Sequence, residues 1–185
     1  MFIQTEPTPN PATLKFLPGR IVAGSNLAEF RSASEAQSSP LAAALFSVDG
    51  VSQVFLGSDF ISVTKTDGEW QHLKPSVLGV IMEHFVSGAP VFSDADAQGD
   101  EEKEFFDAAD ADTVEQIKDL IETRVRPAVA GDGGDITFRG FKDGVVYLAM
   151  KGACSGCPSS TATLKHGIQN LLKHFLPDVR AVEQI

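Results

Sequence analysis

The side chains best suited to chemistry are two cysteines, Cys154 and Cys157, in the stretch GACSGCP at residues 152–158. Two thiols separated by two small residues can meet at one point, where they can bind a soft metal or join in a disulfide. Pro158 suits the first position of a helix. Cys157 should therefore lie at a helix start, where unpaired amide groups and the helix dipole stabilise a thiolate. The chain has only these two cysteines, which excludes a framework of structural disulfides.

Four interpretations of this pair compete. Two inert, buried cysteines are the least favoured, because paired cysteines in a glycine-flanked loop usually mark a site. A redox-active dithiol has the right spacing, but the antiparallel hairpin expected before the motif does not match the thioredoxin pattern. A zinc site needs four ligands, and the nearest candidate, His166, lies too far along the expected helix and points away from its apolar face.

The fourth interpretation is an iron–sulfur cluster shared by two chains. Such clusters are usually held by four cysteine thiolates, and a symmetric dimer would bring two pairs together. The shortage of ligands in one chain then becomes an argument for a dimer. A site with two ligands from each subunit would also be easier to empty than a closed one, as a carrier requires.

No other motif carries a comparable signal. Residues 131–135, GDGGD, lack the third glycine of a dinucleotide fingerprint, the Lys-Ser/Thr pair of a P-loop and the final glutamate of an EF-hand. We predict a tight turn between a helix and a strand there. His72, His84 and His174 have no partner at metal-ligand spacing, and no serine lies in a nucleophile elbow. The sequence predicts a protein that is not an enzyme.

The elements around the cysteines follow from hydrophobic periodicity. A capping box at Thr113–Gln116 should begin a helix that Pro127 kinks or ends. A β-hairpin of residues 136–141 and 145–150 should then lead into the cysteine motif. The apolar residues at helical spacing along the first helix are Val114, Ile117, Leu120, Ile121, Val125 and Ala128.

The register of this hairpin depends on its loop. A three-residue loop at 142–144 places Phe138 opposite Leu148 and Ile136 opposite Met150, so that the large apolar side chains share one face. A two-residue loop would scatter these side chains between the two faces.

The remaining elements complete two similar lobes. A helix from Pro158 should end before Pro177, with Leu164, Ile168, Leu171, Leu172 and Phe175 as its apolar residues, and a short strand should follow at 179–182. In the first half we expect a strand at 12–17, a short helix from Ser39-Pro40, and a hairpin of 51–56 with 60–64. A helix should then run from Pro75 to Gly88. Its apolar residues at helical spacing are Val77, Leu78, Ile81, Met82 and Phe85. We predict an α+β fold of two small α/β lobes, each a hairpin-based sheet packed with helices.

The formal net charge is −10, and its distribution separates the two lobes. Residues 93–112 carry nine acidic residues and one basic residue, whereas the segments on either side are close to balanced. Self-repelling charge with little apolar material predicts an extended or disordered tether, clearest at residues 93–104. We therefore expect domains at residues 1–92 and 113–185, joined by a flexible acidic linker at 93–112. The Phe105-Phe106 pair within that linker could dock on a lobe.

Several stretches of the chain have features of one known family. They are residues 2–11 (FIQTEPTPNP) with 14–16 (LKF), 59–65 (DFISVTK), 132–135 (DGGD) and 152–160 (GACSGCPSS). Together they resemble the Nfu family, NifU-like iron–sulfur scaffold and carrier proteins with an Nfu N-terminal domain and a NifU-like C-terminal domain. The resemblance extends over nearly the whole chain.

The resemblance implies that Cys154 and Cys157 ligate a four-iron, four-sulfur (4Fe-4S) cluster that bridges two subunits and is passed to apo iron–sulfur proteins. It implies a homodimer when the cluster is loaded, and further partners among upstream cluster-assembly proteins. It also implies that the first lobe, which has no cysteine, recognises partners. The alternative is a thiol–disulfide oxidoreductase that uses the same cysteine pair.

Composition excludes two classes of partner. An acidic chain has no electrostatic footprint for binding nucleic acid or an anionic membrane. No apolar run approaches the ~20 residues that a membrane-spanning helix needs. The first residues show neither a secretory signal nor an Arg-rich transit peptide, so we expect a bacterial cytoplasmic protein, although a processed mitochondrial form would have the same sequence features.

Overall fold

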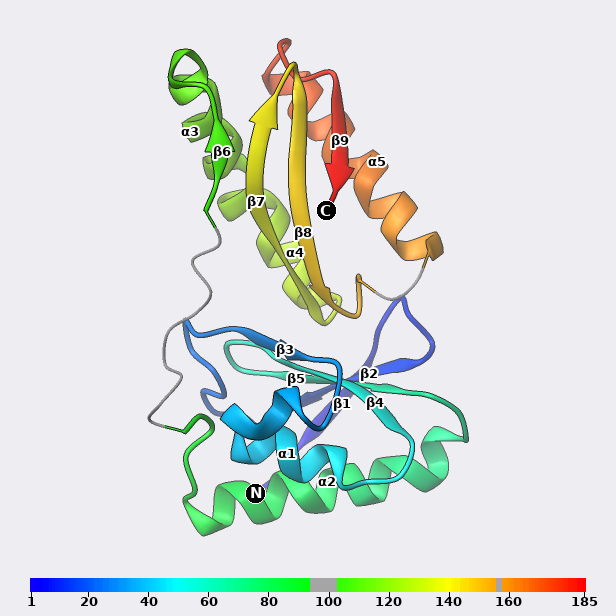
Figure 1. Ribbon diagram of the computed structural model, residues 1–185. Coiled ribbons are helices and arrows are strands. Elements are labelled where there is room, and N and C mark those ends of the chain that lie inside the picture. Colours follow the sequence, from blue (N-terminus) through cyan, green and yellow to red (C-terminus); the bar gives the residue numbers. More distant parts are fainter. Residues whose placement is uncertain (94–102, 156–157) are drawn as a thin grey trace. The chain divides into compact units, whose positions relative to one another are not determined.

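The computed structural model describes residues 1–93, 103–155 and 158–185, apart from the side chain of Ser160 (Figure 1). Most of the expected acidic tether, and Cys157, lie outside these residues. The chain divides into two compact units, Met1–Asp100 (the first unit) and Glu101–Ile185 (the second unit). Each unit contains a sheet and its own helices, which confirms the α+β fold in two lobes.

The first unit is an antiparallel sheet with two helices on one face (Figure 1). The strands, in the order β1-β2-β5-β4-β3, are β1 (Gln4–Pro7), β2 (Thr13–Leu17), β5 (Ile61–Lys65), β4 (Val51–Leu56) and β3 (Ala28–Phe30). A 3₁₀ turn at Glu35–Ser38 precedes α1 (Pro40–Phe46), and α2 (Trp70–Ser87) follows the sheet. Both helices contribute to the same core as the strands, including Leu41, Leu45, Val77, Ile81, Phe16, Val54, Ile61 and Val63.

The helix ends of the first unit have local causes. Ser39 caps α1 by accepting a hydrogen bond from the Ala42 amide at 3.2 Å, and Pro40 occupies the first helical position. Gly88 ends α2 in a left-handed conformation with φ of 71°. The expected start of α2 at Pro75 is wrong, because the helix begins five residues earlier, at Trp70. Pro75 therefore lies inside α2, where it has no amide hydrogen to donate to the carbonyl of Gln71.

The core-facing side of α2 agrees with the expected one except at Met82, since Leu78 and Phe85 are also partly buried against the core. Val77, Ile81 and His84 are buried, whereas Met82 is 41% exposed. Spacing along the sequence marked several apolar residues of this helix, but the position of the sheet decides which of them face the core.

The second unit is a mixed sheet covered on one face by helices. The strands, in sheet order, are β6 (Phe105–Phe106), β7 (Gly134–Lys142), β8 (Val145–Gly152) and β9 (Ala181–Gln184). β7 and β8 are antiparallel, while β6 and β9 run parallel to their neighbours. The helical elements are a 3₁₀ turn (Ala108–Asp110), α3 (Ala111–Leu120), the π-helical turn η3 (Ile121–Val125), α4 (Arg126–Gly131) and α5 (Pro158–Phe175).

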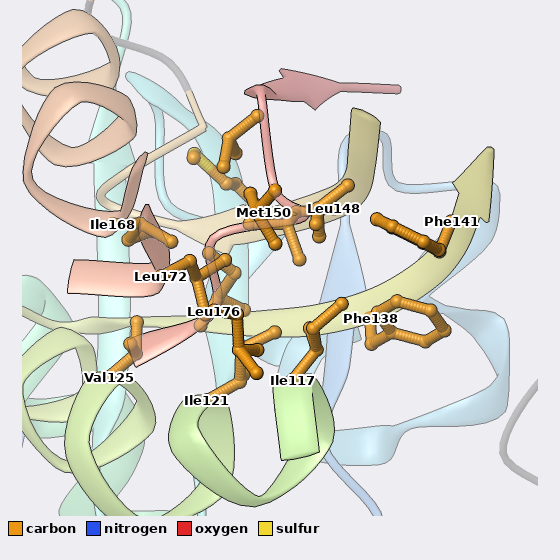
Figure 2. Packing of buried hydrophobic residues seen from close by; sticks show 14 of the residues in the cluster. Ile117, Ile121, Val125, Phe138, Phe141, Leu148, Met150, Ile168, Leu172 and Leu176 are labelled. Carbon is orange, nitrogen blue, oxygen red and sulfur yellow. The ribbon is translucent and has the colours of Figure 1, made fainter. Parts of the chain in front are cut away.

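The core of the second unit lies between these helices and the sheet. Figure 2 shows side chains of α3 and η3 meeting those of α5 and of the strands. The buried residues labelled there are Ile117, Ile121, Val125, Phe138, Phe141, Leu148, Met150, Ile168, Leu172 and Leu176. Phe175, expected to be buried, is 46% exposed because Leu176 and Val179 beyond the helix end close the core instead.

The helix before β7 differs from the expected one in two respects. It begins at Ala111, and Asp110 before it makes no side-chain capping bond, so the predicted capping box at Thr113–Gln116 is wrong. The wider turn η3 changes the phase of the helix, so that Val129 rather than Ala128 is buried. The helix continues through Pro127 to Gly131. A π-helical turn just before a proline relieves the clash that would otherwise end the helix.

The hairpin β7–β8 has the expected cross-strand residue pairs but a shorter loop than predicted. Phe138 lies opposite Leu148, and Ile136 lies opposite Met150, as predicted. The loop, however, has two residues, Asp143 and Gly144, with φ of 52° and 80°, as a type I′ turn requires. A β-bulge between Phe138 and Gly140 adds one residue to β7, so Phe138 and Ile136 still lie opposite Leu148 and Met150 although the loop is one residue shorter than predicted.

A short strand precedes the helices of the second unit. Phe105 and Phe106, within the segment expected as linker, form β6 and pair with β7, which confirms that they dock on a lobe. The Phe105 ring covers Gly140, where an added Cβ would lie 2.4 Å from ring atoms. Beside it, Glu104 forms an ion pair with Lys118 at 2.8 Å.

Candidate functional site

Cys154 lies in a turn that follows β8 directly, in residues 152–155, which we call the Cys154 loop. Gly152 turns the chain with φ of 74°. The Ser155 amide and hydroxyl both donate to the Gly152 carbonyl, at 3.1 and 2.9 Å. Thr161, in the first turn of α5, donates through its hydroxyl to the Cys154 carbonyl at 2.7 Å. The loop is therefore held at both ends, and Cys154 is 4% exposed.

The glycine turn at residues 131–135 forms one wall of this loop. The predicted tight turn is confirmed: Gly133 has φ of 82°, and its carbonyl accepts a hydrogen bond from the Ala153 amide at 3.2 Å. Gly134 faces Cys154 so closely that an added Cβ would lie 3.0 Å from Sγ and 2.6 Å from the Lys151 carbonyl oxygen. This contact was not predicted from the sequence. Two adjacent glycines at the start of a strand were the signal for a close approach.

The surroundings of Cys154 favour the protonated thiol. Burial, with smaller contributions from the charges of Asp132 and Asp135, raises the pKa of the Cys154 thiol to about 11. Cys154 is therefore neutral at pH 7. The thiolate-stabilising helix start was expected for Cys157, which lies outside the described residues.

An ion-pair network that extends from buried Asp135 to exposed Glu122 adjoins the glycine turn. Arg126 donates to both carboxylate oxygens of Asp135, at 2.9 and 3.2 Å, and to Glu122 at 2.7 Å. Burial acts to lower the pKa of Arg126, but these two carboxylates outweigh it and raise the pKa above its usual range. Asp135 is 7% exposed, so this guanidinium holds a negative charge in place near Cys154.

The described residues offer little support for a metal site built by one chain. They contain no group of three or more histidine, cysteine or carboxylate side chains placed to hold an ion. His166 is exposed on α5, as expected, and His84 lies in the first unit. Within the described part of the chain, no helix is long and apolar enough to cross a membrane.

Comparison with known proteins identifies the family. The family description "Scaffold protein Nfu/NifU N terminal" matches residues 3–88, and "NifU-like domain" matches residues 117–183. The protein named "NifU-like protein 5, mitochondrial" from Arabidopsis thaliana is 50% identical over 187 residues, which cover 100% of this chain and 68% of that protein. The chain belongs to the Nfu family.

A second curated relative and a solved structure are also similar to this Nfu protein. The "NFU1 iron-sulfur cluster scaffold homolog, mitochondrial" of Drosophila sechellia is 52% identical over 187 residues, and the chain spans 65% of its length. A solution structure of a NifU-like protein from Saccharomyces cerevisiae is 28% identical, with a TM-score of 0.45, over 50% of this chain and 85% of that one. The names of the Drosophila and Arabidopsis relatives place them in mitochondria. They do not support the bacterial cytoplasmic location expected from the sequence, whereas a mitochondrial form was allowed for.

Proposed function

We propose that this Nfu protein carries a 4Fe-4S cluster bound between two subunits and transfers it to apo iron–sulfur proteins. The observation that carries this proposal is Cys154, held in a glycine-walled loop of a chain whose relatives are named as iron–sulfur cluster scaffolds. Thiolates are the usual ligands of such clusters. Cys154 and Cys157 would supply two from each chain, and a homodimer would supply the four that a cluster takes.

The alternative function, thiol–disulfide exchange, is less well supported. A thiol that attacks disulfides needs a thiolate population at neutral pH and access to its substrate. Cys154 is 4% exposed and lacks that access, and the relatives are named as an iron–sulfur cluster scaffold homolog and a NifU-like protein. Metal binding can displace the thiol proton, because the metal replaces it as the partner of sulfur.

The two units would have different roles. Residues 113–185 would hold the cluster, while residues 1–92, which have no cysteine, would recognise apo iron–sulfur proteins and upstream assembly proteins. The acidic segment before β6 would join them, because the rest of the predicted linker, from Phe105, belongs to the second unit. In this scheme the protein is a carrier and not an enzyme, because the cluster is its cargo and leaves unchanged.

Anaerobic reconstitution of the full chain with ferrous iron and sulfide tests the proposal. We expect a brown protein with about four irons per two chains, and sedimentation should show that the loaded form is a dimer. The Cys154→Ser and Cys157→Ser variants should each lose stable cluster binding while their far-ultraviolet circular dichroism stays unchanged. A complete cluster in the double variant, or a strictly monomeric loaded protein, would refute the shared site.

A further inference from the structure

One face of α5 joins the Cys154 loop to the edge of the sheet. Thr161, Lys165 and Gln169 are spaced four residues apart and therefore share this face. Each makes a polar contact with a different part of the second unit, and we call the three the polar seam. The contacts run from Thr161 Oγ1 to Cys154 O at 2.7 Å, from Lys165 Nζ to Glu183 Oε2 at 2.8 Å, and from Val182 N to Gln169 Oε1 at 3.2 Å.

A cavity of about 360 Å³ opens along the polar seam. Its walls come from three elements: Ser155 of the Cys154 loop, Thr161, Ala162 and Lys165 of α5, and Glu183 and Gln184 of β9. This volume lies at the lower end of the ~300–1,000 Å³ typical of binding sites for small molecules and short segments. The cavity begins one residue from Cys154, because Ser155 forms part of its wall.

β9 presents an edge of the sheet at this cavity. The Ile185 amide donates to the Leu148 carbonyl in β8 at 3.0 Å. Amide directions alternate along a strand, so the amides of Val182 and Gln184 face away from β8. The Gln169 side chain accepts a hydrogen bond from the Val182 amide. Among the described residues, no side chain accepts one from the Gln184 amide. An unfilled edge position beside a cavity is suited to pairing with an added extended segment.

We propose that this cavity binds an extended segment of the acceptor protein that receives the cluster. The inference rests on the carrier function proposed above. An acceptor has to bring its own cysteines close to the cluster, and the cavity adjoins the loop that holds Cys154. An extended backbone can pair with Gln184 while its side chains lie over Ala162. The Lys165–Glu183 ion pair, with side chains 34% and 51% exposed, offers a charge of either sign.

The Ala162→Tyr variant tests the cavity with a matched control. Ala162 is exposed and lines the cavity, so a tyrosine there fills the space without removing any contact of the polar seam. The Asn170→Tyr variant places the same ring on an exposed position of α5 that is not part of the cavity wall. Both full-length variants are loaded anaerobically, their iron, sulfide and visible circular dichroism are measured, and transfer to an apo four-iron ferredoxin is followed.

We expect the two variants to hold the same cluster content with the same visible spectrum. Transfer from the Ala162→Tyr variant should be slower by about tenfold, the equivalent of ~1.4 kcal/mol, while transfer from the Asn170→Tyr variant should match the wild type. Equal transfer rates would overturn the docking site. A loss of cluster or of the dimer in the Ala162→Tyr variant alone would assign the cavity to a second copy of this chain and would also overturn it. A wild-type protein that retains no cluster would refute the carrier function itself, and this would be seen before any transfer is measured.

Discussion

Replacing Gly134 by alanine should destabilise the second unit and displace Cys154. The added Cβ would lie 2.6 Å from the Lys151 carbonyl oxygen and 3.0 Å from Cys154 Sγ. Gly134 pairs with Gly152 across the β7–β8 ladder, so the nearest obstacle is main chain, and no rotamer change can relieve the overlap. Overpacking of this kind costs about 1–3 kcal/mol, and the reduced entropy of the unfolded chain offsets only about 0.4–1 kcal/mol. We expect a net loss of about 1–2 kcal/mol.

The Gly167→Ala variant is the matched control for this experiment. Gly167 lies within α5, and an added Cβ there meets no atom within 4 Å. Alanine in such a helical position should stabilise the second unit by about 0.5–1 kcal/mol. The two glycine variants should therefore change stability in opposite directions.

Intrinsic probes allow the two units to be followed separately during urea unfolding. The chain has one tyrosine and one tryptophan: Tyr147 lies in the second unit, and Trp70 lies in the first. The Gly134→Ala variant should lower the unfolding midpoint seen through Tyr147, leave the Trp70 transition unchanged and bind less iron on reconstitution. Wild-type stability together with full cluster content would refute the argument that Gly134 is needed for the close approach of Cys154.

Two further predictions concern the charged groups of each unit. The Arg126→Met variant leaves Asp135, which is 7% exposed, without its cation and should reduce the unfolding free energy of the second unit by about 1–3 kcal/mol. The Glu122→Gln variant removes only the exposed partner of Arg126 and should cost less than ~1 kcal/mol. Equal effects of the two variants on the unfolding transition of Tyr147 would contradict this account. In the first unit, burial lowers the pKa of His84 from 6.5, and a backbone hydrogen bond with Ala89 opposes this only in part. Because the unfolded chain then binds the proton more readily, the stability of the first unit should fall as the pH drops below about 6.5, and His84→Phe should remove this slope in urea titrations followed through Trp70.

Local features of the fold were predictable because they depend on residues only a few positions apart. The cap at Ser39, the left-handed stop at Gly88 and the hairpin β7–β8 each rest on short-range chemistry. The strands β1 and β3 were not predicted, because short edge strands are defined by pairing with a neighbour rather than by their own pattern. The bulge in β7 and the turn η3 were missed for a related reason. Each adjusts the chain to a core whose shape is set by distant segments.

The sequence by itself determined the cysteine pair, the acidic segment between two lobes and the family, because composition and spacing are properties of the chain in any conformation. Only the tertiary structure decided what surrounds Cys154. Gly134 and Asp135 approach it from β7 and Thr161 approaches it from α5, and the spacing of these two elements along the chain does not indicate that they meet at Cys154. The raised pKa of the thiol likewise depends on burial and on charges brought close by folding. Desolvation and charge proximity arise only when the chain is packed, so no pattern of residue types could have predicted them.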